Sequence, residues 1–121
     1  MPTALKSIHP NNSYLVRQYI ERWNAATNTY VKWTGASTIV CGFYQDALGV
    51  TPIAGLTNIA MTESSVGSGV YYAIVLGTMT APLSTMTGDT IFQIVTGGTN
   101  SDLRVVVPLL VANPRYALLG D

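Results

Sequence analysis

One stretch near the end of the chain is apolar at every second position over nine residues. Its apolar positions are Leu103, Val105, Val107, Leu109 and Val111. Successive side chains of a strand point to opposite faces, so a period of two predicts a strand with one face in the core. Arg104 falls on the other face of this strand. Pro108 lacks the N–H that a sheet ladder needs, which predicts a sheet edge or a bulge near the end of the strand.

The same β-type pattern recurs along most of the chain. Further runs are rich in Val, Ile, Tyr, Phe or Thr and are bounded by turn-forming residues. These runs are residues 14–23, 30–33, 38–45, 53–60, 70–76 and 90–96. Together with 103–111 they make about seven short strands, the number expected of an antiparallel β-sandwich. The chain of 121 residues suits one such domain.

The segments between the strands predict the turns. Residues 24–29 form a hairpin loop between two strands that end in Trp23 and Tyr30, and its asparagines tolerate left-handed backbone. Residues 97–102 predict a second hairpin, and residues 64–69 predict a third turn.

The two ends of the chain lack this periodicity. We expect residues 1–13 to form an extended N-terminal arm, residues 14–111 the sandwich domain, and residues 112–121 a C-terminal tail. The apolar residues of the tail predict packing on the parent domain or on a neighbouring copy.

Charged residues are scarce. Six basic and six acidic residues make up 10% of the chain, against about 25% in ordinary soluble domains. With a formal net charge of zero, copies of the chain do not repel one another. The shortage favours a surface that a partner subunit covers, as in a homo-oligomer. A surface of Thr, Ser, Asn and Gly is the alternative.

Several classes of partner do not fit this composition. The chain is not basic, so counterion release cannot drive nucleic-acid binding. No run reaches the roughly 18 apolar residues of a membrane span. The first residues lack the pattern of a signal peptide, and the single cysteine, Cys41, cannot form an internal disulfide. We therefore expect folding in a reducing cytoplasm.

Residues that could carry catalysis are few. One histidine, His9, and one cysteine, Cys41, cannot supply the three or four ligands of a zinc site. The carboxylates show neither a calcium-binding pattern nor a favoured catalytic pair, and the glycines form no phosphate loop. We expect no catalytic, cofactor or metal site, and hence no enzyme.

Aromatic residues crowd around the first predicted hairpin. Cross-strand packing, a protein interface and stacking on a glycan each account for such a cluster. Together with the apolar residues of the two ends, they supply the candidate interface residues: Leu5, Ile8, Pro10, Trp23, Tyr30, Trp33, Tyr116 and Leu118.

The stretch Gly69-Val70-Tyr71-Tyr72-Ala73 carries a resemblance. It resembles the Gly-x-Tyr-x-Cys/Ala sequence that opens strand F of immunoglobulin-like sandwiches. The resemblance implies that Tyr71 is a corner tyrosine whose hydroxyl bonds back to the preceding corner. It also implies that Ala73 replaces the disulfide cysteine.

The broader layout of residues 14–111 resembles small bacteriophage virion proteins with Ig-like or jelly-roll sandwiches. These are capsid decoration (cement) proteins and tail or baseplate accessory modules. The resemblance implies a non-enzymatic component, made in the host cytoplasm, that binds capsid or tail subunits in the virion. Capsid decoration, head–tail junction and tail or baseplate remain alternative positions. The alternative function is a glycan- or receptor-binding module, which predicts that the hairpin aromatics are exposed at one tip of the sandwich.

Overall fold

The computed structural model describes residues 6–97 and 100–112, and about half of them lie in strands. The strands are Lys6–Ile8 (β1), Tyr14–Tyr19 (β2), Glu21–Asn24 (β3), Thr29–Lys32 (β4), Val40–Tyr44 (β5), Ile59–Ala60 (β6), Thr62–Glu63 (β7), Val70–Val75 (β8), Thr90–Gly97 (β9) and Asn100–Val111 (β10). The helical elements are Gly77–Thr80 (α1) and the 3₁₀-helix Ala81–Met86 that follows it. The predicted all-β fold is confirmed.

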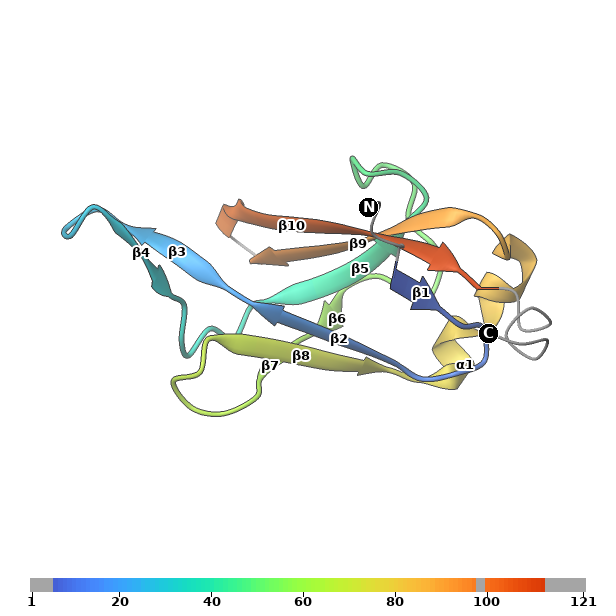
Figure 1. Cartoon of the computed structure of the whole chain (residues 1–121), viewed down its shortest axis with the longest axis horizontal. Coiled ribbons are helices and arrows are strands. Elements are labelled where there is room, and N and C mark those ends of the chain that lie inside the picture. Colours follow the sequence, from blue (N-terminus) through green and yellow to red (C-terminus); the bar gives the residue numbers. More distant parts are fainter. Residues whose placement is uncertain (1–5, 98–99, 113–121) are drawn as a thin grey trace, which may run out of the picture.

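The described strands form three sheets (Figure 1). A five-stranded sheet has the order β1-β10-β9-β5-β6, and a three-stranded sheet has the order β2-β8-β7. The hairpin of β3 and β4 makes the third. β1 pairs parallel with β10, whereas the other pairs of named strands are antiparallel.

The core lies between the five-stranded and the three-stranded sheet. Phe43, Ile91 and Leu109 face it from the larger sheet, and all three are fully buried. From the smaller sheet, Val16 and Tyr71 pack into the same cluster. Alternate residues of β2 and β8 are buried, as the period of two predicts. The two sheets therefore pack as the layers of a sandwich.

Part of the expected N-terminal arm belongs to the sheet instead. β1 continues the larger sheet through its pairing with the end of β10, and the amide of Ala112 donates to the carbonyl of Ile8 at 2.9 Å. Ile8 is fully buried in the core, and Pro10 is buried as well. A three-residue strand is too short to show a period in the sequence, which is why residues 6–8 resembled an arm.

Two sequence-based strand predictions differ from the structure in their extent. Residues 53–60 were expected to form one strand, yet β6 takes up the last two of them. The backbone adopts positive φ at Gly55 and at Asn58, which an extended strand does not allow. The run 14–23 is divided into β2 and β3 at Ile20, whose buried side chain packs in the core.

Pro108 lies on a part of β10 that forms the edge of the larger sheet among the described strands, as the sequence predicted. It is opposite Phe92 of β9, and the pairing of β10 with β1 begins at the next residue, Leu109. The irregularity of β10 is found elsewhere, between residues 100 and 104.

The core holds two polar atoms that find no hydrogen-bond partner among the described residues. They are the Tyr14 hydroxyl and the Gln93 Oε1 oxygen. Gln93 is 4% exposed and lies opposite Phe43 in the register of β9 and β5. A buried acceptor without a partner destabilises a fold by about 1–3 kcal/mol.

We expect Gln93→Met to leave the free energy of unfolding unchanged or to raise it by about 1 kcal/mol, because the substitution removes an unsatisfied oxygen and keeps the volume. Urea denaturation measures this difference. The control is Ile91→Ala, two residues away on the same strand, which should cost about 2–5 kcal/mol. A loss of stability in Gln93→Met that is comparable to this control would contradict the account.

Candidate functional site

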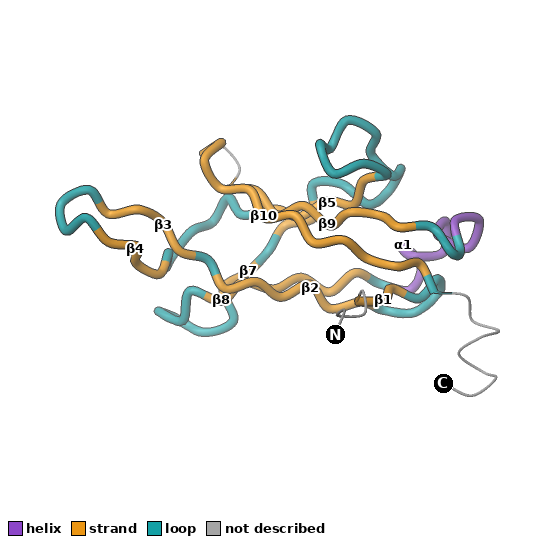
Figure 2. Tube along the Cα trace, turned by 45° about the horizontal axis from the view of Figure 1, so that its top comes forward, coloured by secondary structure: helices purple, strands orange, loops and turns teal. Residues whose placement is uncertain are grey.

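The β3–β4 hairpin reaches beyond both sheets (Figures 1 and 2). Its strands pair Trp23 with Tyr30 and Glu21 with Lys32, and among the described strands they pair with no other. Its turn is built as predicted, because Asn28 adopts positive φ (54°) and the Asn24 side chain accepts the Ala26 amide at 3.0 Å. Isolated two-stranded hairpins are marginally stable in water, so this one depends on how its base is held.

Backbone hydrogen bonds tie the base of the hairpin to the smaller sheet. The Ile20 amide donates to the Gly69 carbonyl and the Trp33 amide donates to the Ile20 carbonyl, both at 2.9 Å. Gly69 has φ +72°, and a Cβ on it would lie 2.9 Å from the Cβ of Lys32. A glycine is therefore required where the turn before β8 crosses the hairpin base.

The hydroxyl of Tyr71 fixes the chain that leaves the hairpin. It donates to the Trp33 carbonyl at 2.7 Å and accepts the Ala36 amide at 3.1 Å. The Tyr71 side chain is fully buried. The immunoglobulin resemblance predicted a bond to the corner directly before the tyrosine, and the structure shows a corner more than thirty residues earlier instead.

The Glu63 carboxylate links the loop that leaves the hairpin to the turn before β8. Its Oε1 accepts the Gly35 amide at 3.0 Å, and its Oε2 accepts the Gly69 amide at 2.9 Å. These bonds, the Gly69 amide first and the Gly35 amide second, lower the pKa of the Glu63 carboxyl below its usual value. Glu63 thus supports the hairpin base in its ionised form.

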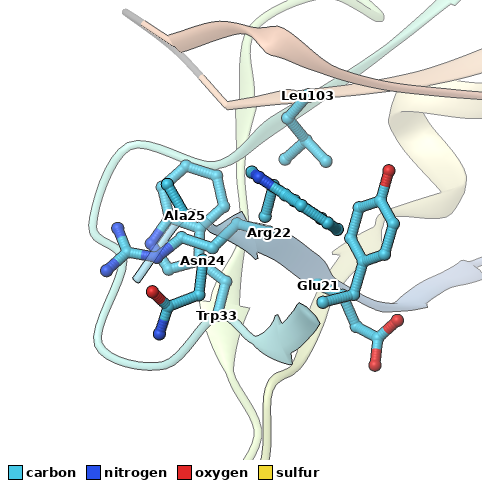
Figure 3. Close-up of a pocket in the computed structure, with 8 residues that line it drawn as sticks. Glu21, Arg22, Asn24, Ala25, Trp33 and Leu103 are labelled. Carbon is cyan, nitrogen blue, oxygen red and sulfur yellow. The ribbon is translucent and has the colours of Figure 1, made fainter. Parts of the chain in front are cut away.

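A cleft of about 540 Å³ opens between the hairpin and the start of β10 (Figure 3). Its lining residues are Glu21, Arg22, Trp23, Asn24, Ala25, Tyr30, Trp33 and Leu103. The rings of Trp23 and Tyr30 meet edge to face, with centroids 5.1 Å apart and planes at 72°. They are 52% and 66% exposed. The prediction of exposed hairpin aromatics therefore holds for these two residues.

Trp33 differs from the other two aromatics. It is half-buried and packs against the core cluster, and the Arg22 guanidinium lies 5.8 Å from the centre of its ring. Leu103, which reaches down from β10 in Figure 3, also packs against the core. One wall of the cleft is therefore fixed to the domain, while Trp23 and Tyr30 lie on the projecting hairpin.

A second surface feature is the outward face of β2 and β8, which we call the outer sheet face. Leu15 and Ile74 are directly opposite each other in the register and are 51% and 56% exposed. Leu76, which directly follows β8, is exposed as well, and Tyr72 lies opposite Arg17. Residues 70–76 are apolar or aromatic at every position, a pattern typical of a strand that is covered on both faces. This apolar run is the sequence feature from which an exposed apolar surface could have been predicted.

The structure separates the candidate interface residues into three groups. Trp23 and Tyr30 are exposed, and Trp33 is half-buried beside them. Ile8 and Pro10 are buried in their own chain. Leu5, Tyr116 and Leu118 lie outside the described residues.

Within residues 6–97 and 100–112, no group of three or more His, Cys, Asp or Glu side chains could hold a metal ion. Cys41 is buried, and burial raises the pKa of its thiol to about 11, so it is a poor nucleophile at neutral pH. Within the same part of the chain, no helix has the length and apolar character to cross a membrane.

Comparisons of the chain with protein-family models, with curated proteins and with solved structures found no match.

We expect Tyr71→Phe to lower the free energy of unfolding by about 1–3 kcal/mol, because it leaves the Trp33 carbonyl and the Ala36 amide without their partner. Urea denaturation measures the loss, and faster hydrogen exchange at Ala36 localises it. The matched control is Tyr72→Phe on the opposite face of the strand, which should cost less than about 0.5 kcal/mol. Equal effects of the two changes would contradict the role given to the Tyr71 hydroxyl.

Glu63→Gln should lower the melting temperature at neutral pH. Because the folded-state pKa of Glu63 is lowered, its stabilisation is present above the usual pKa of 4.5 and is lost as the pH falls through the folded-state value. The gap between wild type and variant should therefore narrow as the pH drops below about 4.5. The pKa of Asp46 is also lowered by backbone hydrogen bonds, but Asp46 is present in both proteins, so its titration does not change the difference between them. A gap that is constant across this range would contradict the assignment.

Proposed function

We propose that the protein is a non-enzymatic structural subunit that binds further copies of itself in a larger assembly. The observation that carries this proposal is the outer sheet face. Both faces of β8 carry apolar or aromatic side chains, but the chain itself covers only one face. On the other face, Leu15 and Ile74 form a directly opposed apolar pair that is exposed to solvent. Exposed apolar patches of this kind mark interaction sites.

The low charge of this face supports a second copy as its occupant. Arg17 is exposed, and β2 and β8 carry no other charged residue, so a two-fold contact brings mainly apolar and aromatic side chains together. The low total charge and the net charge of zero add no repulsion between copies.

The strand order supports an immunoglobulin-like form of the sandwich. β10-β9-β5-β6 follows the order G-F-C-C′, and β2-β8-β7 follows the order B-E-D of variable-type domains. In this correspondence β8 takes the place of strand E, so Tyr71 does not hold the F-strand position that the sequence resemblance gave it. The β3–β4 hairpin is then an insertion between strands B and C.

A bacteriophage virion is the assembly that we propose, with capsid decoration as the first position. The support for it is the resemblance in composition and layout to small phage structural proteins. Many weak contacts of such a subunit act together through avidity on a repeating lattice.

Light scattering over a dilution series tests the proposal. We expect the wild type to form a dimer or a larger species, and Leu15→Thr with Ile74→Thr to raise its dissociation constant at least about tenfold. Both side chains are exposed and threonine suits a strand, so the fold should persist.

The control is Val66→Thr, at a fully exposed apolar residue in the turn between β7 and β8. It should leave the mass unchanged. A wild type that stays monomeric at every concentration, or a double variant that associates as the wild type does, would rule out this face as the contact.

A further inference from the structure

We propose that the cleft between the β3–β4 hairpin and β10 binds a neutral saccharide. This inference rests on the cleft alone and does not depend on self-association through the outer sheet face. The two surfaces use different residues: the outer sheet face consists of β2 and β8, and the cleft consists of β3, β4, Trp33 and Leu103.

Exposed aromatic faces supply the first requirement of sugar binding. A pyranose ring presents C–H groups on its faces and hydroxyls around its rim, so it stacks on an aromatic ring and bonds at its edge. The edge-to-face packing of Trp23 and Tyr30 leaves at least one face of each ring uncovered by the other. Both rings are at least half exposed and line the cleft.

Polar groups beside the rings supply the second requirement. Asn24 offers amide donors, and Glu21 offers the carboxylate oxygen that does not accept the Tyr19 hydroxyl. Arg22 offers a fork of donors. One carboxylate and one guanidinium balance each other, which favours a neutral ligand over a phosphate or an acidic sugar. The cores of protein interfaces are depleted in charged residues, so this lining suits a hydroxylated ligand better than an apolar side chain of a partner.

The dimensions and the rigidity of the cleft fit a small ligand. Its volume of about 540 Å³ lies within the range of roughly 300–1,000 Å³ that is usual for ligand sites. Trp33 and Leu103 are held by the core, and the base of the hairpin is held by Tyr71 and Gly69. Little ordering is therefore needed on binding.

Tryptophan fluorescence tests the proposal directly, because both tryptophans of the chain line the cleft. Wild-type protein is titrated with maltotriose, chitotriose and lactose, each at up to millimolar concentrations. We expect a saturable change with at least one of them. We expect Trp23→Ala to weaken the binding of that sugar at least about tenfold, measured by calorimetry, with an unchanged melting temperature.

Leu48→Ala is the matched control, since Leu48 is also an exposed apolar residue but lies in the loop after β5, and it should bind as the wild type does. Absence of saturable binding for all three sugars would overturn the proposal, as would equal affinity in Trp23→Ala. A change of oligomeric state in Trp23→Ala, without sugar binding by the wild type, would overturn it in favour of a protein contact. The Leu15→Thr and Ile74→Thr variant should keep the sugar affinity, so the two proposals fail separately.

Discussion

The buried hydroxyl of Tyr71 determines where the β3–β4 hairpin lies relative to the two sheets. It holds one carbonyl and one amide of the chain that leaves the hairpin, and each of these groups would otherwise be costly to bury. Gly69 allows the turn before β8 to approach the hairpin base closely. Glu63 links this turn to the loop after the hairpin by accepting one amide from each. The cleft depends on this arrangement, because one of its walls belongs to the hairpin and the other to the core.

The two proposed surfaces lie on consecutive strands of one chain. β2 contributes Leu15 to the outer sheet face, and β3, which follows after Ile20, contributes Trp23 to the cleft. Ile20 is buried and marks the point where the chain leaves the sandwich. The proposed subunit contact and the proposed ligand site therefore use different segments of the chain.

The sequence predicted those strands and turns whose signal lies in neighbouring residues. The alternation in residues 103–111 and the asparagine-rich turn after Trp23 both appear in the structure. Contacts between residues far apart in the chain could not be predicted. The pairing of β1 with β10 and the hydrogen bond from Tyr71 to Trp33 leave no local pattern in the sequence. Trp23 and Tyr30 were predicted from their residue type, whereas Leu103 of β10 reaches the cleft only through the packing of distant segments.

The self-contained pairing of the hairpin has a consequence for how this fold can vary. Since β3 and β4 form their own two-stranded sheet, adding one residue to each strand would lengthen the projection by about 3.3 Å without changing a register inside the sandwich. The framework and the tip are thus separable units. The same two-sheet scaffold can therefore carry hairpins of different length and composition.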